Sequence, residues 1–287
     1  MPLLRKIPLP VLLLSPTLVF LTLFFLIPLI QVSGLAFQSQ DSVFTLANFE
    51  RMVRDIYFDS ALRNTVVLLI LIIPVQLVLA FGAALIVNQR FRGSTFFLYI
   101  YAIPLGISDL AAGLIWLSIF TERGYLNSLM HNLGVLERPL IFLSSLTPKW
   151  MIAAIVLTEV WRATPLVMVI LLSGLQMIAK DYIEAADTFG CSWWQKVRYV
   201  ILPLLKPSIQ SALIMRTMLA FQMFGPILVL AGRQLPVFAS ESYYWYTTVR
   251  NPRVAAAYAL MLMALSLVAT WIYLVVLRTR EEQVGVM

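Results

Sequence analysis

The sequence predicts an all-α integral membrane protein with six spans, and three observations lead to this prediction. Of the 287 residues, 61% are hydrophobic and only 12% are charged, whereas soluble domains carry about 25% charged residues. Apolar runs recur along the chain, each long enough to cross a hydrocarbon layer of ~30 Å. A charged and aromatic stretch, residues 184–203, separates two of these runs. A soluble domain is therefore excluded.

The composition also excludes several kinds of site. The net charge is +7, and the basic residues gather at loop and helix ends, where they orient spans and meet anionic head groups. No nucleic-acid partner is therefore expected. The chain has one cysteine, Cys191, and one histidine, His131. These are too few for a disulfide framework or for a metal site with the usual number of ligands, so no metal or cofactor is expected in this chain.

The first expected span covers residues 7–37 and follows Arg5 and Lys6. The run is too long for a secretory signal and no small-residue cleavage pattern follows it, so it is expected to be retained. Residues 38–62 are too charged to lie in lipid and form the first outer loop.

The second and third spans are expected at residues 64–87 and 96–120, joined by a basic turn at 88–95. Pro104 and Gly106 predict a kink in the third span. Asp109 lies within the same span, where an ionisable side chain usually faces the bundle interior or a watery path. It could equally serve as the structural partner of an arginine on a neighbouring helix, and both interpretations stay open.

The second outer loop, residues 121–149, leads to a fourth span at residues 150–178. Four leucines spaced through the loop predict a short surface helix: Leu126, Leu129, Leu133 and Leu136. Within the fourth span, Glu159 and Arg162 lie three residues apart on one helix face and can neutralise each other. A structural role for this pair is favoured over solute binding.

Residues 181–203 have the pattern of a surface segment. Asp181, Glu184 and Asp187 recur every three residues, opposite Ile183, Ala186 and Phe189, as in a short amphipathic helix. Gly190 follows, where a helix would close in the left-handed conformation. Trp193, Trp194 and Tyr199 alternate with basic residues, as at a membrane–water boundary. The segment therefore predicts a short helix, a turn, a second short helix and a return into the membrane near Pro203.

The fifth span is expected at residues 204–230 and the sixth at 254–277, with an outer loop at 233–253 between them. Arg216 lies about 20 Å along the fifth helix from Pro203, near the middle of the membrane. A lone arginine at this depth is costly, so it must pair with Asp109 or Glu159 or face a polar cavity. The aromatic cluster 243–246 is better explained by an interfacial belt than by sugar stacking.

The segment from Glu184 to Pro203 resembles the EAA loop of binding-protein-dependent ABC importer permeases. The pattern consists of Glu184, Ala185, Ala186, Gly190, Leu202 and Pro203 with the family's spacing, and Val200 stands in place of isoleucine. The resemblance implies a six-helix ABC importer permease bundle with a cytoplasmic EAA coupling helix, within a loop at about 180–203. In such permeases this helix docks on a separate ATPase. Glu184 would face the ATPase, Gly190 would set the turn, and Leu202 and Pro203 would fix the return angle.

The resemblance extends across nearly the whole chain to the maltose-type carbohydrate class, through FTLANFERM, EVWRATP and MRTMLAFQMFGPILVLAGR. It implies a first span and outer loop at residues 1–62, a permease core at 63–280 and a cytoplasmic tail at 281–287. Candidate translocation-path residues are Asp109, Glu159, Arg162, Arg216 and Gln222. Leu219 and Gly225 depart from the family, which often has aspartate there, and this puts the substrate chemistry in doubt.

The resemblance also implies an assembly. Its parts are a second, similar permease in a heterodimer, two ATPase subunits that use ATP and Mg, and an extracytoplasmic solute-binding protein. No phosphate-binding glycine-rich motif occurs in this chain, so no enzyme activity is expected in it. The expected location is a prokaryotic plasma membrane with both termini cytoplasmic.

Two alternatives to a sugar importer stay open. Within the same transport class, the solute could be glycerol phosphate, a polyol or another small polar molecule. The rival class of protein is a self-contained secondary transporter or channel.

Overall fold

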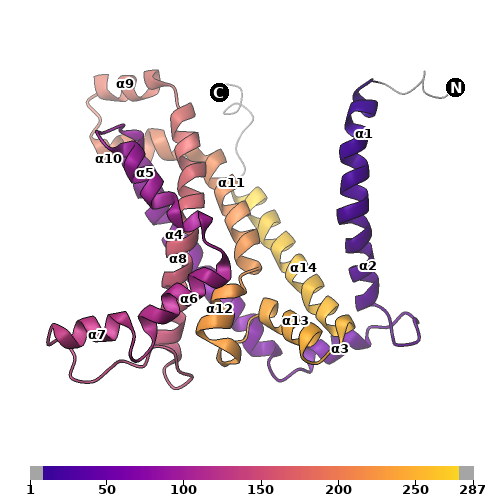
Figure 1. The fold of residues 1–287 in the computed structure, drawn as a ribbon. Coiled ribbons are helices and arrows are strands. Elements are labelled where there is room, and N and C mark those ends of the chain that lie inside the picture. The colour runs from indigo at the N-terminus through magenta and orange to yellow at the C-terminus, as the bar shows by residue number, and fades with distance from the viewer. Residues whose placement is uncertain (1–8, 278–287) are drawn as a thin grey trace. The chain divides into compact units, whose positions relative to one another are not determined.

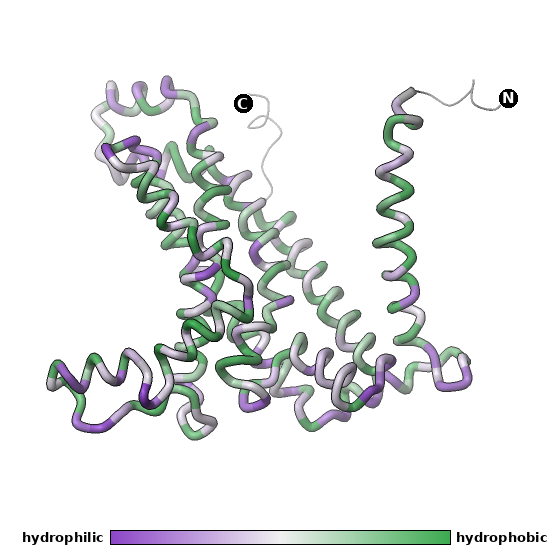
Figure 2. The backbone as a smooth tube through the Cα atoms, in the orientation of Figure 1, coloured by the Kyte–Doolittle hydropathy of each residue, from purple (hydrophilic) through white to green (hydrophobic). Residues whose placement is uncertain are grey.

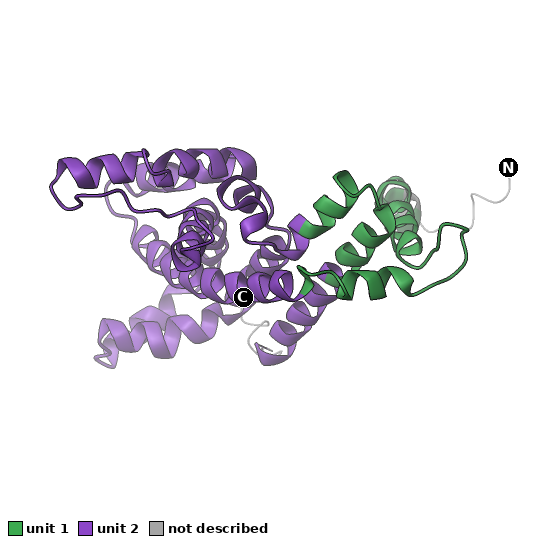
Figure 3. Cartoon of the chain, turned by 90° about the horizontal axis from the view of Figure 1, so that it is seen from below, with its two compact units in different colours: residues 1–58, 241–261 green, residues 59–240, 262–287 purple. Residues whose placement is uncertain are grey.

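The computed structural model describes residues 9–277, which are almost entirely helical. The chain divides into two compact units (Figure 3). Unit 1 comprises residues 1–58 and 241–261, and unit 2 comprises residues 59–240 and 262–287. Residues 1–8 and 278–287, which include Arg5, Lys6 and the predicted cytoplasmic tail, lie outside the described residues.

The helical elements follow one another along the chain (Figure 1). They are α1 (Leu9–Leu21), the π-helical turn η2 (Thr22–Leu26), α2 (Ile27–Ala36), α3 (Ala47–Val53), α4 (Phe58–Asn88), α5 (Ser94–Ala102), η3 (Ile103–Gly106), α6 (Asp109–Phe120), α7 (Tyr125–Asn132), α8 (Pro148–Met177), α9 (Lys180–Thr188), α10 (Trp193–Lys196), the π-helical turn η4 (Val197–Ile201), α11 (Leu202–Phe221), α12 (Gly225–Leu230), η5 (Gly232–Gln234), α13 (Phe238–Thr247) and α14 (Pro252–Val276).

Apolar residues occupy most of the length of the long helices, and polar residues gather at the helix ends and in the connecting segments (Figure 2). Among the described residues, four helices are long and apolar enough to cross a membrane, and a fifth crossing is added if the bent pair α5 and α6–α7 counts as one. The all-α membrane fold is therefore confirmed. The expected number of six spans stays a prediction.

Two of the expected spans are broken. The third bends by 102° between η3 and α6, which is the kink that Pro104 and Gly106 predict. The fifth, expected over residues 204–230, is interrupted, because α11 ends at Phe221 and α12 begins at Gly225. Pro226 occupies the first turn of α12, where its fixed φ and missing N–H suit the start of a new helix.

Two π-helical turns share one sequence feature. Each turn closes with an amide bonded five residues back, Ile27 N–H to the Thr22 carbonyl and Leu202 N–H to the Val197 carbonyl. A proline follows directly, Pro28 in the first case and Pro203 in the second. Proline clashes with the carbonyl four residues back in an α-helix, and a wider turn removes that clash. The helix therefore continues through both prolines.

Among the described residues, unit 2 packs around several clusters of buried side chains, two of which are the largest. The first includes Leu68, Ile155 and Ile227, and the second includes Ala84 and Leu205. Helices α8 and α11 come very close at Gly174, where an added Cβ atom would collide with the Ser208 side chain. Only glycine fits this crossing. The close approach holds the helices on either side of α9 together.

Unit 1 contains the first long helix and the polar residues after it. Asn48 Nδ2 donates to the carbonyls of Ala36 and Gln38, both at 2.9 Å, and so fixes the chain at the end of α2. Trp245 is 9% exposed, and its Nε1 donates to Asp55 Oδ2 at 2.7 Å. Trp245 is therefore an internal anchor of this unit, whereas the sequence pattern assigns it to an interfacial belt.

Candidate functional site: a surface helix and a buried ionic network

Helix α9 lies at one end of α8 and α11, and α7 lies at the other end of unit 2 (Figure 1). The predicted short surface helix is confirmed, as is a short helix, α7, within residues 121–149. Glu184 and Ala185 are exposed, while Ala186 is buried and Ile183 is half-buried. Phe189 is 86% exposed, so it does not share the buried side of α9 as its spacing predicts, because α9 ends just before it.

Gly190 closes α9 in the way the sequence predicts. Its φ is +70°, and its N–H donates to the Asp187 carbonyl at 2.9 Å while Cys191 N–H donates to the Ala186 carbonyl at 3.0 Å. These two bonds define the Schellman closure of a helix. No atom lies within 4 Å of the place where a Cβ would stand. Glycine is therefore required here by backbone conformation alone.

Helix α10 is fixed by local bonds and one ion pair. Ser192 and Gln195 form a capping box, which satisfies two amide groups that a helix start leaves unpaired. Lys196 Nζ lies 2.6 Å from Asp187 Oδ1 and ties α10 to α9. The expected second short helix is not a separate element, because α10, η4 and α11 follow one another without a break. Leu202 and Pro203 are exposed at the start of α11.

The segment from α9 to η4 exposes several large apolar side chains beside its charges. They are Tyr182, Phe189, Trp193, Trp194 and Tyr199. A surface that combines exposed aromatic rings with carboxylates is typical of a protein or membrane contact. The segment therefore has the composition of a docking surface.

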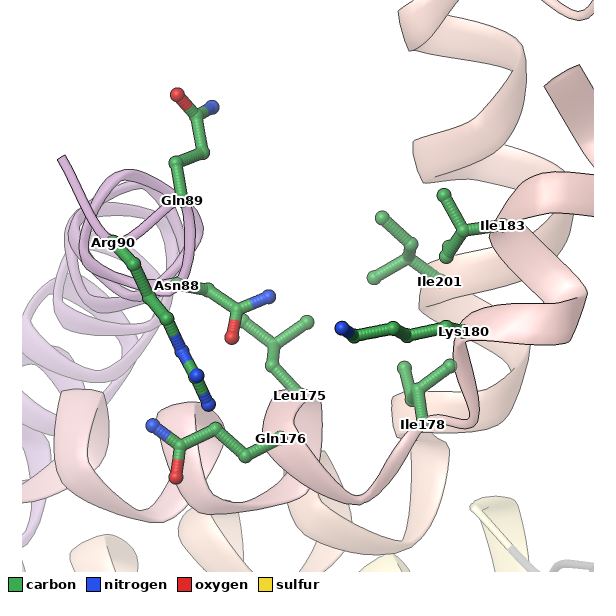
Figure 4. A pocket seen from close by; sticks show the side chains of 9 residues that line it. All are labelled: Asn88, Gln89, Arg90, Leu175, Gln176, Ile178, Lys180, Ile183 and Ile201. Atoms are coloured by element: carbon green, nitrogen blue, oxygen red, sulfur yellow. The ribbon is translucent and has the colours of Figure 1, made fainter.

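A cavity of about 260 Å³ lies beside the start of α9 (Figure 4). The Lys180 side chain extends from α9 toward the Asn88 side chain at the end of α4, with Gln176 and Arg90 nearby. Arg90 has a φ of +51°, a conformation that residues other than glycine adopt rarely. The cavity thus joins the basic turn after α4 to the base of α9.

A second cluster is buried in the helix bundle. Arg216 Nη2 lies 2.7 Å from Glu159 Oε2, and Arg216 Nε donates to Gln76 Oε1 at 2.6 Å. Gln76 Nε2 in turn donates to the Glu159 carbonyl at 2.7 Å. All three residues are 0–1% exposed. The prediction that Arg216 needs an anionic partner is confirmed, and that partner is Glu159.

The network continues toward a more open end. Arg162 contacts Glu159 Oε1 at 3.1 Å and Asp109 Oδ1 at 2.8 Å. The Asp109 side chain is 45% exposed, whereas that of Arg162 is 18% exposed. Two carboxylates and two guanidinium groups thus form one chain of alternating charge across α6, α8 and α11. Their charges sum to zero, so burial at this depth is tolerable only for the complete set.

The structure leaves one candidate residue outside this cluster and adds another that the sequence did not single out. Gln222 is exposed at the end of α11 and makes none of the network's bonds. Gln76 belongs to the network, and its position as the one amide in the apolar run 66–87 of α4 was a usable signal for it. Gly225 stood out only as a departure from the family, yet a Cβ there would lie 2.6 Å from the Asp109 Cβ. The glycine therefore lets α12 pack directly on the start of α6.

Residues 76–281 match the family described as binding-protein-dependent transport system inner membrane component. The chain belongs to this family. It is 30% identical over 285 residues to a sulfoquinovosyl glycerol transport system permease protein of Agrobacterium fabrum, covering 95% of this chain and 91% of the relative. It is 32% identical over 215 residues to a trehalose/maltose transport system permease protein of Thermococcus litoralis, covering 73% and 71%.

A solved structure has the same fold. It is a crystal structure of a bacterial ABC transporter involved in the import of the acidic polysaccharide alginate, with a TM-score of 0.80 at 19% identity over 94% of this chain and 95% of the matched chain. The chain is therefore a multi-pass permease component of a binding-protein-dependent transport system. A self-contained secondary transporter or channel, the rival interpretation of the sequence, does not agree with this family.

Proposed function

We propose that this chain is the permease subunit of an ATP-driven importer for a sugar or oligosaccharide. The relatives support a carbohydrate solute, since their names include sulfoquinovosyl glycerol, trehalose and maltose. Glycerol phosphate, a polyol or another small polar molecule is the alternative within the same transport class. ATP and Mg act in a separate ATPase subunit and not in this chain.

The observation that carries the proposal is the exposed helix α9, placed between α8 and α11 and closed by Gly190. Glu184, Ala185 and Ala186 form its second turn, and Leu202 and Pro203 begin the helix that returns into the bundle. In this proposal α9 docks on the ATPase, and α8 and α11 move with it because Gly174 and Ser208 hold them in contact. Movement of the ATPase surface is thereby transmitted to the spans.

The ionic network keeps the spans rigid during that movement. Glu159, Arg162 and Arg216 join α8 to α11, and Asp109 adds the start of α6. Because their charges neutralise one another, we assign them to helix positioning. Asp109 is the member of the set with the greatest access to a polar path, and Gln222 is a second candidate for that path because it is exposed.

The assembly proposed for this chain contains a second permease as a heterodimer partner, two ATPase subunits and an extracytoplasmic solute-binding protein. A solved alginate transporter of the same fold is in complex with a pentasaccharide-bound periplasmic protein, which supports the last partner. We place both termini in the cytoplasm. The permease core is proposed to span residues 63–280, after a first span and outer loop at 1–62 and before a tail at 281–287.

The test is reconstitution of the purified importer, isolated through a tag on this chain, in proteoliposomes. We expect an ATPase and a second permease to co-purify, and ATP hydrolysis to drive uptake of a sugar delivered by the binding protein. A chain that purifies alone and moves solute without ATP would contradict the proposal. Uptake of glycerol phosphate or a polyol in place of sugars would retain the importer and correct the solute.

A further inference from the structure

A second basic cavity lies in unit 1 and has a volume of about 290 Å³. Three arginines line it. Arg51 lies in α3, Arg250 in the turn before α14, and Arg253 in the first turn of α14. Asn48 and Asn251 add amide groups to its wall. The described residues of the wall include no carboxylate, so its positive charge has no counterpart there.

The three guanidinium groups are short of partners. Among the residues that the structure describes, none of them forms an ion pair, and the Nε of Arg253 is buried with no hydrogen-bond partner. Arg51 lies over the Trp245 ring at 5.5 Å from its centroid. A buried donor of a charged group that lacks an acceptor is costly. An anion in the cavity would supply that acceptor.

The backbone around the cavity is also arranged for an anion. Arg250 has a φ of +56°, and Asn251 N–H donates to the Trp245 carbonyl at 2.9 Å, which fixes the turn. Strained conformations of this kind persist where the surrounding structure imposes them, often at binding sites. The turn leads directly into α14, a helix of 25 residues, whose N-terminal dipole end adds partial positive charge.

We propose that this cavity binds the carboxylate of an acidic side chain that the solute-binding protein presents to the outer face of the importer. The inference rests on the proposed function, which supplies that partner. Helix α4 covers about 46 Å from Phe58 to Asn88 at ~1.5 Å per residue, and Asn88 lies in the cavity beside α9. The segment before Phe58 therefore leads into the end of α4 that is distant from the coupling helix.

A soluble partner fits the cavity wall better than a lipid does. Its apolar lining is limited to Val249 and Pro252 among the described residues, and a phospholipid head group needs an apolar flank for its glycerol and acyl chains. The cavity beside α9 offers such a flank through Leu175, Ile178 and Ile201. One arginine guanidinium group can bind a carboxylate with two parallel hydrogen bonds, which give specificity as well as attraction.

The test measures stimulation of ATP hydrolysis by the solute-loaded binding protein, with the complete importer in nanodiscs. Arg253→Gln and Arg250→Asn remove one positive charge each, and asparagine tolerates the left-handed backbone at position 250. Arg54→Gln is the matched control, because Arg54 lies in the same outer segment but pairs with Glu50 at 2.6 Å and lies outside this cavity. Each variant is compared at low and high salt and in nanodiscs with and without anionic phosphatidylglycerol.

We expect both cavity variants to raise the half-stimulating concentration of binding protein by about tenfold or more and to weaken its salt dependence, with Arg54→Gln within about twofold of wild type. Equal effects in all three variants would overturn the proposal in favour of general surface charge. Effects confined to nanodiscs with phosphatidylglycerol would overturn it in favour of a lipid head group. If no binding protein stimulates the wild-type ATPase, the proposed importer function is contradicted, and the inference that rests on it is overturned as well.

Discussion

The buried ion pair between Arg216 and Glu159 shows how a charged residue inside the bundle constrains its neighbours. Their contact is 2.7 Å long, and their side chains are 2% and 0% exposed. Gln76 completes the arrangement by accepting from Arg216 and donating to the Glu159 backbone. Removing one member of a buried ion pair leaves the other charged and unpaired, and this costs more than the pair itself contributes.

Glu159→Gln should therefore destabilise the protein by about 3–5 kcal/mol. The substitution keeps the side-chain shape and leaves Arg216 without its carboxylate. Asp109→Asn is the control, since it removes an equal charge from the half-exposed end of the network, where a pair contributes about 0–1 kcal/mol. Thermal unfolding in one detergent measures both. Equal losses of stability for the two variants would show that Glu159 has no special role. A Glu159→Gln/Arg216→Met double variant should regain part of the lost stability, because it leaves no unpaired charge at this position.

At the scale of single elements, α9 and α7 end in the same way. Gly190 and Gly134 both have a φ of +70°, and in neither case does an atom lie within 4 Å of the position that a Cβ would take. After α7, Gly134 N–H donates to the His131 carbonyl and Val135 N–H to the Met130 carbonyl, as Gly190 and Cys191 do after α9. A residue with a Cβ would therefore meet the same backbone strain at either turn.

Gly190→Val should reduce ATP-driven uptake by up to about tenfold, because a left-handed residue with a Cβ costs about 1–2 kcal/mol and shifts the turn away from its docking geometry. Gly134→Val carries the same backbone cost in the outer loop and should leave uptake near wild type. Gly190→Asn should fall between them, since asparagine tolerates this conformation. Uptake and membrane abundance are measured together. A similar loss for both valine variants would assign the effect to folding.

The same elements show what sequence alone can predict. The α9 helix and its glycine turn were predictable because spacing and backbone chemistry are local. The break between α11 and α12 was missed, although Pro226 marks it, because the apolar composition continues through it. The union of α10 with α11 was missed because proline usually breaks a helix, and here the π-helical turn before Pro203 relieves the clash.

The candidate site also contains features that the local sequence predicts and features that depend on how the helices pack. A lone arginine near mid-membrane had to find an anion, so Arg216 could be predicted to pair with Asp109 or Glu159. Which of the two, and the part of Gln76, depend on how α4, α8 and α11 pack, and spacing within one helix carries no information on this. Gln222 follows Arg216 by six residues, a spacing that does not match whole turns of ~3.6 residues, so the two side chains do not share a helix face. The helix α11 also ends just before Gln222.

At the scale of the whole molecule, the orientation in the membrane decides which polar surface meets which partner. We propose that α9 and the basic turn with Arg90 lie in the cytoplasm, in agreement with the tendency of short basic loops to remain there. The chain has one cysteine, Cys191, which is partly exposed in the turn between α9 and α10. The protein therefore carries a natural reporter beside the coupling helix.

A maleimide reagent that cannot cross membranes should leave Cys191 unlabelled in intact spheroplasts and label it in inside-out vesicles. In a Cys191→Ser background, Ser128→Cys places the same thiol on an exposed position of α7, and it should show the opposite pattern because α7 lies at the other end of unit 2. Bound ATPase should slow labelling of Cys191, since a docked subunit excludes the reagent. Labelling of Cys191 from outside would place α9 out of reach of ATP and would rule out its coupling role.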